Sequence, residues 1–129
     1  MRKELIENNP ILKLTLEFSL LIVEYCHLLQ LEKKFTLSNQ LLFCGTSIGA
    51  NSFESQNAES KADFIHKIKI AAKEAEETQY WLLLCDFSSS YPDCKNLGAK
   101  LSEIQRILNS ILGTAKRKNP LSYFLSLFL

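Results

Sequence analysis

The sequence predicts an all-α protein with the architecture of an antiparallel up-and-down four-helix bundle. Apolar residues recur at steps of three and four in four long segments, and no segment shows the apolar–polar alternation of a strand. Only 4 Gly and 3 Pro occur in 129 residues, which is typical of a helical protein. Short polar connections favour helices that run up and down in order. We expect one domain over residues 1–129.

Composition and charge exclude several classes of protein. The formal net charge is +1, so no strong overall field attracts the chain to nucleic acid or to an anionic membrane. No apolar run reaches the roughly 20 residues that span a bilayer, and the first residues do not resemble a secretory signal. The four cysteines, Cys26, Cys44, Cys85 and Cys94, are widely spread and form no C-x-x-C pair. They predict reduced thiols in a soluble cytoplasmic protein.

The first predicted helix covers about residues 10–34. Pro10 suits its first turn, where a missing N–H costs nothing. One face carries Ile11, Leu14, Phe18, Leu21, Tyr25 and Leu28. A second line of apolar residues contains Leu12, Ile22, Cys26 and Leu29. Because a surface helix of a monomer needs one apolar stripe, the extra width suggests that this helix also meets another subunit.

The second predicted helix covers about residues 38–56, with Ser38 as its N-cap, and contains the unusual stretch "GTSIGANS". Gly45 and Gly49 share one side, which Ser52 extends, and each glycine costs a helix about 1 kcal/mol relative to alanine. We therefore expect these three residues to permit close helix packing. A phosphate-binding loop is the alternative, but it needs a preceding strand and a Lys-Ser/Thr pair, and both are missing.

The third and fourth predicted helices cover about residues 60–86 and 94–118. Ser60 followed by Asp63 resembles a helix start signal, and Asn119-Pro120 ends the last helix. The third helix has the strict heptad line Phe64, Ile68, Ala71, Ala75, Thr78, Leu82 and Cys85. The fourth has Leu97, Leu101, Ile104, Leu108, Ile111 and Ala115. This spacing favours nearly parallel or antiparallel packing of long helices.

The stretch "LSNQLLFCGTSIGANSFESQNAESKADFIHKIKIAAKEAEETQYWLLLC", residues 37–85, resembles a known family signature. It is similar to bacterial four-helix-bundle proteins encoded by intervening sequences of 23S ribosomal RNA genes. Their pattern pairs "S-x-Q-L-L-R-S-x-T-S-I-G-A-N" with "S-x-x-D-F-I-x-K-x-x-I-A-x-K-E-A-x-E-T-x-Y-W-L". This chain departs from it at Phe43, where arginine is usual, and at Ser52-Phe53, where an aliphatic–acidic pair is usual.

The resemblance implies a bundle that assembles into a ring, most simply a homopentamer, without known enzymatic activity. It does not imply a true ribosomal protein. A related group of accessory proteins for retroelement reverse transcriptases shares the ring and binds nucleic acid through a basic surface. By analogy, RNA or DNA is a candidate partner, although an analogy of fold is a weak argument for function.

Basic residues near two helix ends are the candidate nucleic-acid contacts. They are Lys61, Lys67, Lys69 and Lys73 on the third helix and Lys116, Arg117 and Lys118 near the end of the fourth. Ordinary solvated lysines are the better explanation of the first set, because its spacing spreads it over more than one face. In a ring of five copies, however, the charges of each subunit add up, and binding would fall steeply with salt.

Large aromatic residues are the candidate oligomer contacts. Trp81 lies beside the apolar stripe of the third helix, so it is expected either in the core or at a subunit interface. The apolar tail "PLSYFLSLFL", residues 120–129, is too short to span a membrane, and Phe124 and Phe128 fit one face of a short helix. We expect this tail to dock on its own bundle, on a neighbouring subunit or on another partner.

Carboxylates and histidines suggest one enzymatic alternative, a di-metal carboxylate bundle. Glu24 and His27 form an E-x-x-H pair, Asp63 and His66 a similar one, and Glu54 and Glu103 would complete the ligand set. At 100° per residue, however, both histidines point away from the apolar faces, whereas metal ligands must converge inside the bundle.

The sequence therefore predicts a non-enzymatic homo-oligomer without a cofactor, a metal or a small-molecule substrate. A di-metal enzyme and a partner-binding module that uses the C-terminal tail are the alternatives.

Overall fold

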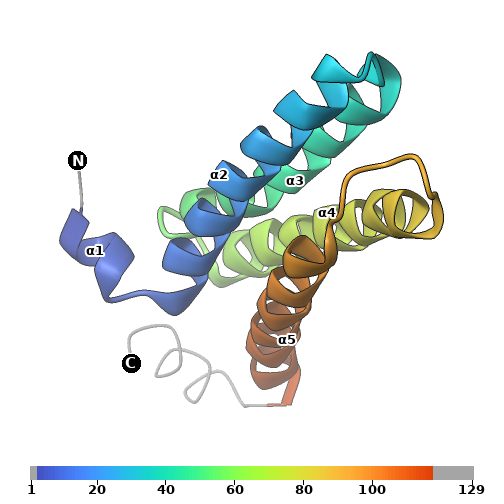
Figure 1. Cartoon of the computed structure of the whole chain (residues 1–129). Helices are drawn as coiled ribbons and strands as arrows, with labels where there is room; N and C mark the ends of the chain where they lie inside the picture. The colour runs from blue at the N-terminus through green and yellow to red at the C-terminus, as the bar shows by residue number, and fades with distance from the viewer. Residues whose placement is uncertain (1–2, 118–129) are drawn as a thin grey trace.

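A computed structural model describes residues 3–117 and contains helices α1 (Lys3–Glu7), α2 (Pro10–Leu31), α3 (Phe35–Ser55), α4 (Lys61–Phe87) and α5 (Lys95–Arg117) (Figure 1). The all-helical prediction is confirmed, and no strand occurs between residues 3 and 117. The short helix α1 was not predicted, because five residues are too few to display a helical period. None of these helices combines the length and the apolar character that crossing a membrane requires.

Helix α2 begins as its sequence predicts and ends three residues earlier than expected. The Asn9 side chain accepts a hydrogen bond from the Leu12 N–H, and Pro10 occupies the first turn. At the other end, Lys33 has a left-handed φ of 61°. This conformation lets the Lys34 N–H donate to the Leu29 carbonyl at 2.9 Å, which closes the helix.

Helix α3 begins at Phe35, so the predicted N-cap at Ser38 is wrong. Lys34 occupies the cap position without a side-chain hydrogen bond. Ser38 is fully buried inside the helix, where its hydroxyl donates to the Cys26 carbonyl of α2 at 3.1 Å. A hydroxyl can satisfy a backbone group of a neighbouring helix as well as its own helix end, and sequence alone does not distinguish the two.

Helices α4 and α5 follow their predicted apolar lines closely. The Ser60 hydroxyl accepts from the Asp63 N–H at 3.0 Å, which confirms the start signal of α4. The predicted line of α4 is buried from Ile68 to Cys85, and Phe64 is half-buried at its start. In α5 the core positions are Leu97, Leu101, Ile104 and Leu108.

The four long helices surround one apolar core in chain order. Helix α3 packs against α2 and α4, and α5 packs against α4 and α2. Within the described helices, the backbones of α2 and α4 do not approach each other closely, so these two helices lie diagonally across the bundle and meet only through side chains in the core. Figure 1 shows that α4 runs in a different direction from the α2–α3 pair, so the arrangement is not a regular antiparallel four-helix bundle. The heptad spacing determines which helix faces pack together. The angle at which the helices cross depends on the size of the side chains between them.

Hydrogen bonds also fix the connection between α4 and α5. The Tyr25 hydroxyl of α2 donates to the Pro92 carbonyl in this connection at 2.7 Å. Burial raises the pKa of Tyr25, and nearby Cys85 raises it further, so the hydroxyl keeps its proton and this bond at neutral pH. The bond therefore ties the start of α5 to α2 as well as to α4.

Candidate functional site

The small residues of α3 face α2. An added β-carbon at Gly45 would lie 3.0 Å from Cγ1 and Cγ2 of Ile22, and one at Gly49 would lie 3.3 Å from Cβ of Thr15. Ser52 is fully buried, and its hydroxyl donates to the Ile48 carbonyl of its own helix at 2.8 Å. These residues bring two backbones together and leave no room for a ligand between them.

The residues of the di-metal alternative lie apart on the outside of the bundle. His27, His66, Glu24 and Glu103 are exposed. Glu54 accepts a hydrogen bond from Lys67 at 3.2 Å. Residues 3–117 contain no group of three or more carboxylate, histidine or thiol side chains that could hold a metal ion. Both histidines point away from the apolar helix faces, as their positions in the helical repeat predict, so the ligands do not converge.

The four cysteine thiols are free and buried in the core. Burial raises the pKa of Cys26, Cys44 and Cys94 to about 11. Burial also raises the pKa of Cys85. A thiol in this environment stays protonated at neutral pH and is a poor nucleophile, so the structure offers no activated cysteine.

Four apolar side chains form an exposed stripe on the outer side of α4, which we call the α4 stripe. They are Tyr80, Leu83, Leu84 and Phe87. Their spacing of i, i+3, i+4 and i+7 matches one helix face, on the side opposite the buried line that ends at Leu82 and Cys85. Phe87 is 85% exposed. An apolar face of this kind is typical of a helix that packs against a partner.

Helix α2 carries a second exposed apolar line, the α2 stripe, which consists of Leu16, Leu20, Val23 and Leu31. Leu20 is 60% exposed at its centre, and the exposed His27 lies between Val23 and Leu31. None of these residues belongs to the two apolar lines predicted for this helix, and the second predicted line (Leu12, Ile22, Cys26 and Leu29) is buried inside the bundle, so it does not meet another subunit as expected. Because α2 and α4 are diagonal in the bundle, the two stripes lie on opposite sides of the molecule.

Trp81 lies next to the α4 stripe and is half-buried. Its ring N–H donates to Glu77 at 3.3 Å, and its ring meets Tyr80 edge to face with 5.5 Å between centroids. Trp81 also lines an open depression of about 510 Å³ beside the α2–α3 turn. On the rim of this depression, Nζ of Lys34 lies 4.7 Å from the ring centroid of Tyr91. The other predicted oligomer contacts, Phe124 and Phe128, lie outside the described residues.

The predicted basic residues of α4 do not form one patch. Lys67 pairs with Glu54 at 3.2 Å, and Lys61 is half-buried. Lys69 and Lys73 are exposed one turn apart on the outer side of α4, further toward its N-terminus than the α4 stripe. Lys116 and Arg117 belong to the last turn of α5, and Lys118 lies outside the described residues.

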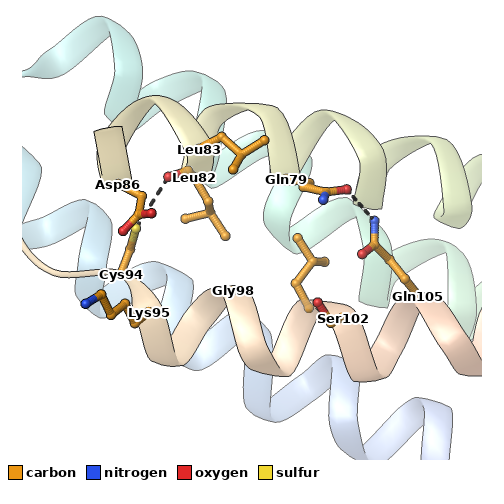
Figure 2. Close-up of a pocket in the computed structure, with 10 residues that line it drawn as sticks. Gln79, Leu82, Leu83, Asp86, Cys94, Lys95, Gly98, Ser102 and Gln105 are labelled. Atoms are coloured by element: carbon orange, nitrogen blue, oxygen red, sulfur yellow. Dashed lines mark hydrogen bonds between the residues drawn. The ribbon is translucent and has the colours of Figure 1, made fainter. Parts of the chain in front are cut away.

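A groove between α4 and α5 was not predicted (Figure 2). It has a volume of about 290 Å³ and is lined by Gln79, Leu82, Leu83, Asp86, Cys94, Lys95, Gly98, Leu101, Ser102 and Gln105. Leu83 belongs both to this groove and to the α4 stripe, so the two form one continuous surface. Gly98 is the sequence feature that could have indicated the groove, because a glycine within a predicted helix needs a structural explanation.

A family model described as 23S rRNA-intervening sequence protein matches residues 7–110. The chain belongs to this family. The resemblance inferred from residues 37–85 is therefore confirmed. Both apolar stripes and the groove fall inside the range of the 23S rRNA-intervening sequence protein model, whereas the basic residues 116–118 and the apolar tail fall outside it.

A solved relative of this 23S rRNA-intervening sequence protein shares its fold. It is a protein of unknown function from the S23 ribosomal protein family of Bacteroides thetaiotaomicron, with 41% sequence identity and a TM-score of 0.77. The match covers 81% of this chain and 99% of that chain. No curated protein matches the sequence. Neither the family description nor this relative indicates a catalytic activity.

Proposed function

We propose that the protein is a non-enzymatic, cytoplasmic building block that assembles with copies of itself into a closed ring. The family resemblance suggests five copies. The observation that carries the proposal is the pair of exposed apolar stripes on opposite sides of the bundle. Exposed apolar side chains that gather on one face are unfavourable in water and are typical of surfaces that a partner covers. The four free thiols agree with a reducing compartment.

The position of the two stripes favours a head-to-tail contact. A two-fold dimer pairs one surface with itself, and it would cover one stripe and leave the other in water. If the α2 stripe of one copy packs on the α4 stripe of the next, every copy in a closed ring has both stripes covered. This arrangement buries the exposed apolar side chains without a second kind of subunit.

Light scattering after size-exclusion chromatography tests the assembly. The wild-type protein is expected to elute as an oligomer whose mass is a whole multiple of the chain mass, 14.7 kDa. A charge in either stripe, Leu20→Lys in α2 or Leu84→Lys in α4, is expected to prevent ring closure. Phe43→Lys is the matched control, because Phe43 is an exposed apolar residue of α3 outside both stripes.

Mixing the two variants tests the direction of the contact. Leu20→Lys keeps an intact α4 stripe and Leu84→Lys keeps an intact α2 stripe, so an equimolar mixture is expected to form a 1:1 dimer. Each variant alone is expected to be a monomer. A wild-type protein that stays monomeric at every concentration would refute the assembly, and a mixture without the dimer would refute the head-to-tail contact.

Nucleic-acid binding is a second candidate function, and the exposed pair Lys69 and Lys73 favours it. Neither lysine forms a salt bridge within residues 3–117. In a ring these charges repeat in every copy, as do those of Lys61, Lys116, Arg117 and Lys118. Filter binding of RNA and DNA over a range of salt concentrations tests this function. Affinity that falls steeply with salt, and falls further in Lys69→Ala/Lys73→Ala, is expected.

The tail remains a candidate contact between copies, together with Trp81. A chain that lacks residues 120–129 is expected to assemble more weakly than the full chain if Phe124 and Phe128 contribute to this interface. Assembly of the shortened chain with unchanged affinity would remove the tail from the proposal and leave the two stripes as its basis.

A further inference from the structure

Gly98 in α5 has no role in the packing or backbone conformation of its own chain. An added β-carbon at this position would meet no atom within 4 Å, in contrast to Gly45 and Gly49, which press against α2. The backbone of Gly98 is ordinary helix, with its N–H bonded to the Cys94 carbonyl at 3.0 Å and without a positive φ. Glycine weakens a helix interior relative to alanine, and the space beside Gly98 is open to a group from outside the chain.

The groove around Gly98 has an apolar floor and polar residues at its edges. Leu82 and Leu101 are buried in its floor, and Leu83 forms part of its wall. The Cys94 thiol donates to the Leu82 carbonyl at 3.4 Å, which leaves it already bonded. Figure 2 shows the polar groups near the ends of the groove, where the amides of Gln79 and Gln105 bond to each other at 3.1 Å. The other polar lining residues, Asp86, Lys95 and Ser102, are exposed at the edges of the groove, above the buried floor.

The α2 stripe has the shape and chemistry that this groove needs. Leu16, Leu20 and Val23 follow one another at steps of four and three, so they form one exposed ridge on a helix. The groove continues into the α4 stripe through Leu83, and it lies away from the α2 stripe of its own chain. The ridge of one copy can therefore reach the groove of another copy only.

We propose that the groove between α4 and α5 receives the ridge of Leu16, Leu20 and Val23 from a second copy of the chain, with Gly98 as the point of close helix approach. This inference rests on the proposed assembly and identifies where the subunits interlock. A residue without a β-carbon lets the two helix axes come closer than any other residue would allow. The glycine thus stabilises the assembly at a cost to the isolated helix.

Substitutions at Gly98 test the proposal through the dissociation constant of the assembly, measured by analytical ultracentrifugation. Gly98→Phe fills the groove with its own side chain and is expected to weaken assembly at least tenfold. Gly98→Ala is the matched control. It is expected to weaken assembly less than Gly98→Phe and to raise the helix content or thermal stability of dilute protein. Circular dichroism checks that both variants fold.

A photo-crosslinking residue at Ser102, which is exposed and lines the groove, identifies the occupant directly. Crosslinks from a mixture of isotope-labelled and unlabelled chains are expected between Ser102 and peptides of residues 10–31 of another copy. The same residue at Asn109, which is exposed one heptad further along α5, is expected to give no such crosslink. Crosslinks from Ser102 to α3 or to residues 118–129 would overturn the choice of occupant.

The outcomes separate the two proposals. A wild-type chain that sediments as a monomer would refute the assembly as a whole. A wild-type oligomer whose affinity is unchanged by Gly98→Phe, or whose Ser102 crosslinks do not reach α2, would refute the groove contact and leave the assembly standing.

Discussion

Gly45 of α3 lies directly against Ile22 of α2, so that a β-carbon on Gly45 would approach both Cγ1 and Cγ2 of Ile22 at 3.0 Å. Both residues are fully buried or nearly so, which leaves the isoleucine little freedom to move away. This contact determines how closely α2 and α3 approach each other.

The first prediction is that Gly45→Ala destabilises the protein by about 1–2 kcal/mol. Overpacking of a core costs about 1–3 kcal/mol, and the helix propensity of alanine returns at most about 1 kcal/mol. Urea unfolding at one protein concentration measures the change. In a double-mutant cycle, Ile22→Ala is expected to remove most of the penalty of Gly45→Ala, and independent effects of the two substitutions would contradict the contact.

The second prediction concerns Lys33, which has a positive φ at the end of α2. A side chain in this conformation costs about 1–2 kcal/mol, and glycine avoids the cost. Lys33→Gly is therefore expected to raise the free energy of unfolding by about 1 kcal/mol. Lys33→Ala removes the same charge but keeps the β-carbon, so it should give no comparable gain. Equal effects of the two variants would show that charge, rather than conformation, governs this position.

The third prediction is that Ser60→Ala lowers the stability by about 1 kcal/mol, since it removes the hydrogen bond from the Asp63 N–H. Ser60→Asp keeps an acceptor at the cap and is expected to retain the wild-type stability. Thermal unfolding followed by circular dichroism compares the three proteins. If Ser60→Ala had the same thermal stability as the wild-type protein, the cap would have no energetic importance.

The fourth prediction is that Glu74 makes the protein less stable as the pH rises. Burial and then nearby Glu77 raise the pKa of Glu74 in the folded state above its ordinary value of 4.5, and its Oε2 is buried without a hydrogen-bond partner among the described residues. Below pH 4.5 both the folded and the unfolded state carry the proton. As the pH rises from there through the raised pKa, the unfolded state releases its proton first, so the free energy of unfolding falls.

Glu74→Gln is expected to remove this part of the pH dependence and to stabilise the protein at neutral pH. Glu76→Gln, at an exposed position of the same helix, controls for the loss of one negative charge. Urea unfolding at a series of pH values measures the difference between the two variants. Identical profiles for both would contradict a special environment of Glu74.

Much of the fold could be predicted from the sequence because burial repeats along a helix. The line from Ile68 to Cys85 in α4 is periodic, and the structure buries it as expected. Ser38 shows where this reasoning ends. Its hydroxyl bonds to Cys26 of another helix instead of capping its own, and only the three-dimensional arrangement reveals that choice. The crossing angle of α4 likewise depends on side-chain fit and not on the period.

The candidate site was harder to predict than the fold. The second apolar line of α2, which suggested a partner, is buried inside the bundle, and the exposed Leu20 belongs to neither predicted line. In α4 the sequence drew attention to Trp81, whereas its neighbours Leu83 and Leu84 are the more exposed apolar residues. The groove required two helices to be placed side by side, so no pattern within α5 alone could indicate it.

The diagonal placement of α2 and α4 has a consequence for the size of the proposed ring. A head-to-tail contact does not by itself limit the number of subunits. The rotation between successive subunits decides whether the assembly closes into a ring or continues as a filament. That rotation follows from the tilt of α4 relative to α2, which the helix crossings within each monomer fix. A substitution at Gly49, which packs against Thr15 and Ser19 of α2 and belongs to neither stripe, would thus convert a closed assembly into an open fibre while leaving the side chains of both stripes unchanged.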